Sequence, residues 1–233
     1  LRKEAISVCY ALAENVFAVS QSEGVKTDVY NNKEYVSCGK ILPGVSVLIV
    51  KDGRDITGDG HGRIYIKSSS HPKLKKEDDL FYGYYNTGDI GFVKGQELYI
   101  IDRQKDSFVT YGINVYPSLV EKEISNLKQI KSGRVACFGV QNEAKGTHEV
   151  YVCAETEAEP EEHIKIKRLI TQKIKDTFEF SAKVYLKEVG FLIKTPSGKV
   201  SRHNIKEKLC KLDELDEKKV LNIVNEYLIS SGK

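Results

Sequence analysis

The chain has 233 residues, of which 40% are hydrophobic and 30% are charged, a composition typical of globular proteins with a buried core. Thirty-six basic residues face 33 acidic ones, and the resulting net charge of +3 does not indicate nucleic acid or an anionic membrane as the main partner. No window approaches the roughly 18–20 apolar residues of a membrane span, and the N-terminus lacks the order and length of a secretory signal, so we expect a cytoplasmic protein.

The first 102 residues have the pattern of a β-rich unit. Residues 1–20 suggest a strand end that runs into an apolar helix or turn. From residue 35 to 102, short β-branched or aromatic runs alternate with Gly, Asp and Pro, which predicts a meander or a small barrel. The segment GDGHGR, residues 58–63, resembles a phosphate-binding loop but leads into a strand, so we predict a hairpin turn with His61 in solvent.

After Arg103 the pattern changes to alternating strands and helices. Pro117 is predicted to begin a helix over 117–130, whose apolar residues Val120, Ile124, Leu127 and Ile130 recur at helical spacing. Strands over 134–140 and 149–155 come next. A helix over 160–178 follows them, with Ile166, Leu169, Ile170 and Ile174 on one face.

The end of the chain is predicted to hold a strand over 183–193, the segment RHNIKEKLC and an amphipathic helix within 213–229. The apolar stripe of that last helix is expected to pack on the small domain, with docking of a carrier or partner as the alternative. The sequence therefore predicts an α+β chain, with a β-rich, barrel-like unit at 1–102 and a small α/β domain at 103–233.

Four short stretches carry residues suited to phosphate chemistry, and each is ordinary when taken alone. They are YALAEN with Tyr10 and Glu14, YYNTGDIG with Asp89, DRQKDSFVTYGINVYP with Arg103, Lys105 and Gly112, and KTPSGKVSR with Lys199. Pro-Ser-Gly is common turn chemistry, and Arg-x-Lys-Asp occurs in solvated charge clusters. Because all four stretches occur together in this order, we do not attribute them to chance.

In this order the four stretches resemble the adenylate-forming superfamily of acyl-CoA synthetases, nonribosomal-peptide adenylation domains and fatty acyl-AMP ligases. The resemblance runs from Tyr10 to about residue 210. It implies the C-terminal part of an enzyme that uses ATP and Mg²⁺ to activate a fatty acid as an acyl-adenylate, with the missing N-terminal part as its partner. By the resemblance, Tyr10 lies beside the adenine and Glu14 helps to hold Mg²⁺.

The resemblance also implies roles for the other residues. Asp89 would bind the ribose hydroxyls with help from Arg103, and Lys199 would reach the reacting atoms. A hinge is implied near residues 103–106, at Lys105, because Lys199 must enter for adenylation and then withdraw for the attacking thiol. The loop at Gly112 would leave room for a pantetheine arm. A lysine, as a compact point charge on a long stem, suits such a role.

Two positions favour an acyl carrier protein over CoA as the acceptor. Asn114 stands where acyl-CoA synthetases commonly have arginine, and Ala13 stands where many relatives have threonine. Without that arginine, a CoA phosphate has one charge partner fewer. At the hinge strand, Asp102 replaces the usual glycine, a change that affects local geometry.

We therefore expect a fatty acyl-AMP ligase fragment that is inactive by itself. The alternatives are an acyl-CoA synthetase, an amino-acid adenylation domain and a non-catalytic interaction module.

Overall fold

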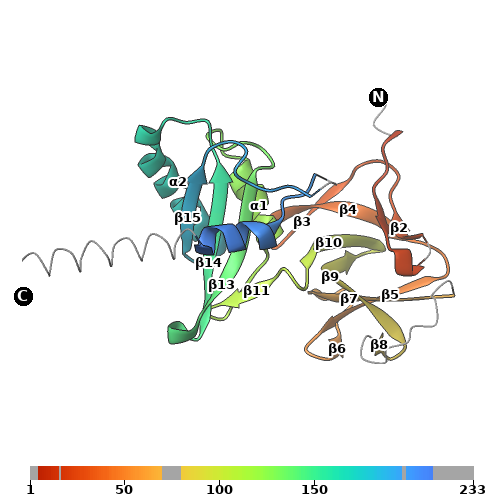
Figure 1. The fold of residues 1–233 in the computed structure, drawn as a ribbon. Coiled ribbons are helices and arrows are strands. Elements are labelled where there is room, and N and C mark those ends of the chain that lie inside the picture. The colour runs from red at the N-terminus through yellow and green to blue at the C-terminus, as the bar shows by residue number, and fades with distance from the viewer. Residues whose placement is uncertain (1–4, 16, 70–79, 196–197, 212–233) are drawn as a thin grey trace, which may run out of the picture. The chain divides into compact units, whose positions relative to one another are not determined.

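The computed structural model describes residues 5–15, 17–69, 80–195 and 198–211, and the predicted helix within 213–229 lies outside them (Figure 1). The chain divides into two compact units, Leu1–Ser107 and Phe108–Lys233. The predicted hinge near 103–106 stays a prediction. Among the described residues, no helix is long and apolar enough to cross a membrane.

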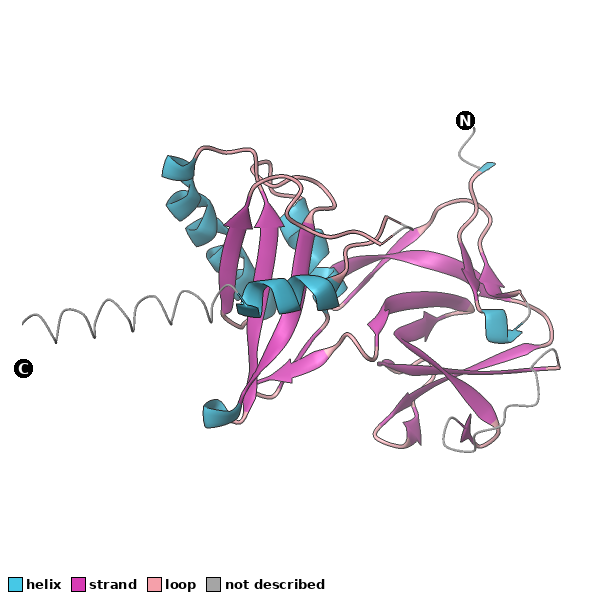
Figure 2. Ribbon diagram, in the orientation of Figure 1, coloured by secondary structure: helices cyan, strands magenta, loops and turns pink. Residues whose placement is uncertain are grey.

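Unit 1 consists almost entirely of antiparallel strands (Figure 2). Their order in the sheet is β1-β2-β4-β10-β9-β7-β5-β6, with β3 paired to β4 and β8 paired to β9. The strands are β1 (Cys9–Ala11), β2 (Ala18–Gln21), β3 (Thr27–Tyr30), β4 (Lys33–Ile41), β5 (Val45–Lys51), β6 (Arg54–Asp55), β7 (His61–Ser68), β8 (Leu80–Phe81), β9 (Tyr84–Lys94) and β10 (Glu97–Arg103). The predicted β-rich unit is confirmed.

The core of unit 1 is formed by β-branched and aromatic side chains that adjacent strands direct to the same side. Its buried members are Tyr10, Val19, Val47, Ile49, Ile64, Ile66, Val93 and Leu98. The apolar run after residue 10 contains no α-helix; a short 3₁₀ turn, η2 (Ala13–Asn15), joins β1 to β2. Of the two predicted possibilities, a helix or a turn, the structure has the turn.

The prediction that His61 is a solvated turn residue is wrong. His61 begins β7 and is half-buried, with its ring edge-on to Tyr30 and Nδ1 3.3 Å from the Tyr30 hydroxyl oxygen. Burial is the main cause that lowers the pKa of His61, with Lys51 contributing. The glycines that precede it do form the expected turn, but the strand begins earlier than the sequence suggested.

Unit 2 is an α/β arrangement built on a three-stranded sheet in the order β13-β14-β15 (Figure 1). β13 (Val135–Asn142) is antiparallel to β14 (Thr147–Glu155), and β15 (Ala182–Lys187) is parallel to β14. The hairpin β11 (Phe108–Thr110) and β12 (Ile113–Val115) precedes α1 (Pro117–Ser125), and α2 (His163–Phe178) connects the parallel strands. Short 3₁₀ turns are η4 (Glu143–Lys145) and η5 (Pro160–Glu162), and residues 202–211 are helical.

The sheet of unit 2 is covered on both faces. One face packs against α1 and α2 through a core that includes Val120, Ile124, Ile166, Ile170 and Ile174. The other face packs against Leu192 and the helical segment 202–211 through a second core, which consists of Ala136, Phe138, Tyr151, Cys153, Leu192, Ile205 and Leu209. Alternate residues of β13 and β14 therefore contribute to opposite cores, as the two-residue period of a strand requires.

Several predicted boundaries in unit 2 are wrong. The first helix ends at Ser125, and Leu127 and Ile130 follow in successive tight turns. Leu169 does not share the buried face of α2, because its side chain is 41% exposed. The strand predicted over 183–193 ends at Lys187. Pro117 does begin α1, where a missing backbone N–H leaves no helical hydrogen bond unmade.

Candidate nucleotide site and lysine turn

Asp89 is the centre of the candidate site in unit 1. It follows a Thr-Gly bend within β9, where Gly88 has φ +74° and the Asp89 N–H donates to Thr87 Oγ1 at 3.1 Å. The Thr87 hydroxyl in turn donates to the Ile64 carbonyl of β7 at 2.9 Å. This local network fixes the direction of the Asp89 side chain, which is only 5% exposed. Thr87 belongs to the YYNTGDIG stretch, but its hydrogen bonds could not be predicted from the sequence.

Tyr10 supplies one partner of this carboxylate. Its hydroxyl donates to Asp89 Oδ2 at 2.5 Å, although the two residues lie 79 positions apart. Burial, and next the hydrogen bond to Asp89, raise the pKa of Tyr10 far above its usual range. The phenol therefore remains a hydrogen-bond donor at any physiological pH.

Arg103 supplies the second partner, and a β-bulge places it. Ile100 pairs with Gly91 and Asp102 pairs with Ile90, so the ladder skips one residue before Arg103 comes opposite Asp89. The Arg103 Nε then lies 3.1 Å from Asp89 Oδ1, while its side chain remains 58% exposed. Beside it, Asp102 is buried and its Oδ1 accepts the Arg103 N–H at 2.8 Å.

The structure thus brings Tyr10, Asp89 and Arg103 together. Among the described residues, each oxygen of the Asp89 carboxylate has one side-chain partner, and an ionised carboxylate has about four acceptor positions in total. Two further hydroxyl groups can therefore be accepted without breaking either contact. Of the two partners of Asp89, Tyr10 is buried and Arg103 is exposed.

Glu14 belongs to the same unit as these residues. Its backbone lies in η2, directly after β1, whereas its side chain is outside the described part of the chain. Among the described residues, no cluster of three or more His, Cys, Asp or Glu side chains could hold a metal ion by itself. A single carboxylate still fits Mg²⁺, because this ion commonly takes one or two carboxylates together with phosphates and water.

Lys105 lies in the turn that follows β10. Its side chain is exposed, and the turn is closed by the Asp106 and Ser107 N–H groups, which both donate to the Arg103 carbonyl at 3.1 Å. The Gln104 N–H donates to the Gly88 carbonyl at 2.8 Å, which ties the start of the turn to the Asp89 bend. A hinge role for Lys105 is not tested by these contacts and stays a prediction.

Gly112 lies in unit 2 at the turn between β11 and β12. Its φ of +81° is a conformation that side chains rarely adopt, whereas a Cβ built there would meet no atom within 4 Å. The backbone conformation alone therefore accounts for glycine, and the room for a pantetheine arm stays a prediction. Asn114, two residues later, is exposed on β12.

Lys199 is exposed on a turn of unit 2, which we call the Lys199 turn and define as residues 193–195 and 198–201. Lys194 and Val200 form an antiparallel bridge, and the Thr195 N–H donates to the Lys199 carbonyl at 2.7 Å. The Gly198 N–H donates to the Thr195 carbonyl at 2.8 Å, and Gly198 has φ +81°. The lysine is thus presented by a tight, hydrogen-bonded backbone.

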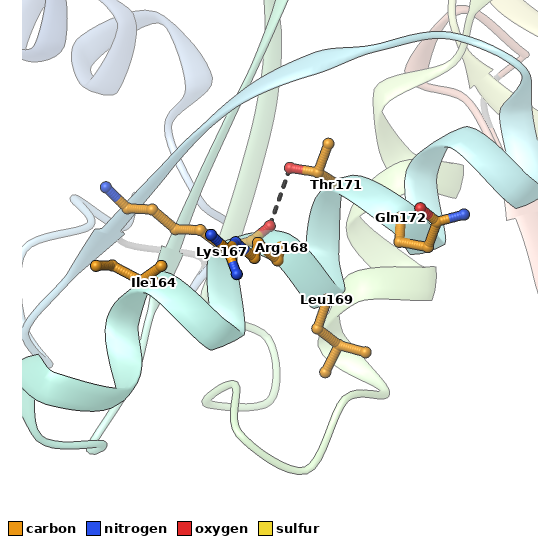
Figure 3. Close-up of a pocket in the computed structure, with 6 residues that line it drawn as sticks. All are labelled: Ile164, Lys167, Arg168, Leu169, Thr171 and Gln172. Carbon is orange, nitrogen blue, oxygen red and sulfur yellow. Dashed lines mark hydrogen bonds between the residues drawn. The ribbon is translucent and has the colours of Figure 1, made fainter.

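A separate open hollow lies on the outer side of α2 (Figure 3). It is lined by Ile164, Lys167, Arg168, Leu169, Thr171 and Gln172. Its walls are aliphatic, basic and neutral polar side chains of a single helix, and none of the predicted site residues contributes to it. We therefore assign it no part in the candidate site.

The chain is similar to curated ligases over different parts of its length, although no protein-family model matches it. It is 35% identical over 127 residues to the probable long-chain-fatty-acid–AMP ligase FadD30 of Mycobacterium tuberculosis. The matched stretch covers 51% of this chain and 21% of the relative. It is 29% identical over 185 residues to the 2-succinylbenzoate–CoA ligase of Bacillus licheniformis. This second match covers 76% of this chain and 37% of the relative. The chain therefore spans well under half of these relatives.

Solved structures show the same fold. A fatty acyl-adenylate ligase from work on the E. coli and L. pneumophila enzymes has a TM-score of 0.73 at 22% identity, covering 93% of this chain and 44% of that one. The McyG A-PCP structure with phenylalanyl-adenylate has a TM-score of 0.72 at 25% identity, covering 94% and 42%. Bacillus subtilis MenE, in complex with ATP and a magnesium ion, has a TM-score of 0.64 at 20% identity, covering 86% and 41%.

The predicted α+β fold, that of the C-terminal part of an adenylate-forming enzyme, is therefore confirmed. The relatives and structural neighbours are adenylate-forming ligases, and the resemblance to this superfamily is confirmed as well.

Proposed function

We propose that the chain is the C-terminal part of a fatty acyl-AMP ligase. The complete enzyme would join a fatty acid to ATP, giving acyl-adenylate and pyrophosphate, and would then pass the acyl group to the phosphopantetheine thiol of an acyl carrier protein. The observation that carries the proposal is the Asp89 carboxylate held by Tyr10 and Arg103, in a chain similar to adenylate-forming ligases.

Asp89 would bind the ribose of ATP. The carboxylate can accept the two ribose hydroxyls on its remaining lone pairs, and the contacts with Tyr10 and Arg103 hold it oriented for that purpose. Arg103, the exposed partner of Asp89, would lie closest to the nucleotide. Tyr10 would remain next to the adenine edge of the same pocket.

In the first step, a carboxylate oxygen of the fatty acid attacks the α-phosphorus, and the bond to the bridging oxygen of pyrophosphate breaks. Two anions approach each other, so positioning and cations contribute most of the catalysis. Lys199 would supply a positive charge at the reacting oxygens. Mg²⁺, held by Glu14 and the ATP phosphates, would neutralise further charge when bound.

In the second step, the thiol sulfur attacks the acyl carbonyl and AMP leaves. Lys199 would have to withdraw, and a hinge near Lys105 would allow it. The turn at Gly112 would then face the pantetheine arm. The neutral and exposed Asn114 favours a carrier protein, because it offers no positive charge to the phosphates of CoA.

Transfer to CoA is the second candidate. The relative that covers 76% of this chain is named a CoA ligase, which favours this alternative. In either case we expect the chain by itself to release no pyrophosphate, since it spans well under half of its curated relatives.

The test uses the complete protein with a panel of fatty acids, ATP and Mg²⁺, and then offers CoA or holo acyl carrier protein. We expect pyrophosphate release that collapses in Lys199→Ala, followed by transfer to the carrier and not to CoA. Efficient acyl-CoA formation would identify a CoA synthetase instead. Adenylation that is indifferent to Lys199→Ala would contradict the role of this lysine.

A further inference from the structure

The Lys199 turn is attached to unit 2 at both ends by an ion pair. We propose that Arg134–Glu155 and Arg202–Glu121 are positioning groups, which fix the backbone of the Lys199 turn for the adenylation step. This inference rests on the function proposed above for Lys199. In this proposal neither ion pair contacts the substrate.

The first ion pair holds both backbone groups of Leu192, directly before the turn. Glu155 ends β14 and is fully buried, and its Oε1 accepts the Leu192 N–H at 2.6 Å. Arg134 donates from an Nη atom to the Leu192 carbonyl at 3.3 Å, and its Nε lies 3.7 Å from Glu155 Oε2. The Leu192 side chain is itself buried in the second core of unit 2. One ion pair therefore fixes both backbone groups of the residue that leads into the Lys199 turn.

The second ion pair holds the chain directly after the turn. Arg202 donates from Nε and Nη2 to the two oxygens of Glu121, both at 2.7 Å. This bidentate geometry fixes orientation as well as distance. Glu121 lies on α1, and its Oε1 also accepts the Cys137 N–H of β13 at 2.9 Å. The start of the helical segment 202–211 is thus tied to α1 and to the sheet.

The two anchors meet at the base of the turn. The Ser201 N–H donates to the Ile193 carbonyl at 2.8 Å, one residue inside each anchor. Beyond this base, Thr195 and Lys199 are exposed, and only hydrogen bonds of the turn itself are seen for the backbone of Lys199 in the described part of the chain. The position of a long, exposed lysine therefore depends on how rigidly its backbone is held.

The energetic cost of Glu155 supports a positioning role. Among the described residues, Glu155 Oε2 is the only buried side-chain nitrogen or oxygen that makes no hydrogen bond. A buried charge with imperfect pairing is expensive, and an apolar residue often gives equal or greater stability at such a site. An apolar side chain would leave the Leu192 N–H without its acceptor, and the segment that leads into the Lys199 turn would lose this fixed point.

The experiment separates the two half-reactions in the complete protein. Glu155→Gln and Arg202→Lys are each made alone and in the Lys199→Ala background. Single-turnover acyl-adenylate formation is measured first, and transfer from supplied acyl-adenylate to the thiol is measured second. We expect the first step to fall by about 10- to 100-fold, as displacement of a reacting group by an ångström can cause, with the second step unchanged. In the Lys199→Ala background, neither substitution should lower the residual first-step rate further.

Glu149→Gln is the matched control, because Glu149 lies on the same strand and pairs with Lys145 and Lys183 rather than with the turn. It should leave both steps unchanged. An equal fall of both steps, an unchanged first step, or an additive loss in the Lys199→Ala background would each overturn the inference.

If Glu155→Gln does not fold by circular dichroism, Arg202→Lys, in the other ion pair, gives the same test. A first step that is intact in Lys199→Ala alone would instead refute the proposed role of that lysine.

Discussion

Removal of the Tyr10 hydroxyl should lower the free energy of unfolding of unit 1 more than removal of the Tyr99 hydroxyl in the same sheet. In Tyr10→Phe, the ring remains in the core while Asp89 Oδ2 loses a 2.5 Å hydrogen bond. Hydrogen bonds to charged groups contribute about 1.5–3 kcal/mol, and Arg103 is too exposed to compensate for the loss. We expect a decrease in the free energy of unfolding of about 2 kcal/mol, which is about 30-fold in the opening equilibrium.

Peptide-resolved hydrogen exchange is the suitable assay, because the chain has two units and a single unfolding transition cannot be assumed. Peptides that cover the Asp89 bend and the end of β10 should exchange about 30-fold faster in Tyr10→Phe, and those of unit 2 should not change. Burial and Asp89 keep the phenol protonated in the folded state, so the effect should not vary between about pH 6 and 9.

Tyr99→Phe is the matched control within the same sheet. Tyr99 is also buried, but its hydroxyl lies 3.3 Å from Glu97 Oε2, which is long for a hydroxyl donor. Its loss should cost under about 1 kcal/mol. If the two substitutions accelerate exchange equally, Asp89 does not depend on Tyr10, and the geometric basis of the nucleotide site is wrong.

Two further predictions concern other parts of the chain. Hydrogen bonds from Lys145 and then from Lys183 lower the pKa of Glu149 to about 2, so an NMR titration of its carboxyl should not show the usual midpoint near 4.5. Because both lysines are half exposed, Glu149→Gln should cost only about 1 kcal/mol near neutral pH, and this difference should disappear as the pH falls from about 4.5 towards 2. Gly91→Ala should destabilise unit 1 by more than about 3 kcal/mol in urea denaturation, because a Cβ would lie 2.1 Å from a backbone oxygen of the adjacent strand. Gly95→Ala, at φ +65° with open space around it, should cost only about 1 kcal/mol, and equal losses would contradict the packing argument.

The strands could be predicted from the sequence because their periodicity has few competing explanations. Ile64 and Ile66 belong to one core and Tyr65 between them does not, as the two-residue period of a strand requires. Helical periodicity is less decisive. Leu127 and Ile130 continue the spacing of α1, yet the Leu127 N–H bonds to the Ile124 carbonyl and the Ile130 N–H bonds to the Leu127 carbonyl. A three-residue apolar spacing fits such turns as well as a helix, so the helix end could not be fixed.

Motifs in the sequence brought Tyr10, Asp89 and Arg103 together as candidates for a nucleotide site, whereas the geometry in which they meet could not be predicted. Arg103 comes opposite Asp89 only because the ladder of β9 and β10 skips a residue after Ile100. Without that bulge, the register would be shifted by one residue and the side chain would point to the other face. Nothing in the local sequence marks the skipped position. The motifs therefore indicated residues that lie together in the structure, and the sheet register determines how they meet.

Glu155 illustrates the limit of local sequence more sharply. It begins the run ETEAEPEE, a composition typical of a solvated loop, and yet it is fully buried. Its partners, Arg134 and Leu192, come from segments 21 and 37 residues away, and only the pairing of β13 with β14 brings Arg134 beside it. A carboxylate at this position makes sense only when a backbone N–H must be held from inside the core. The residue that composition would assign to solvent is thus the one that links the sheet of unit 2 to the segment leading into the Lys199 turn.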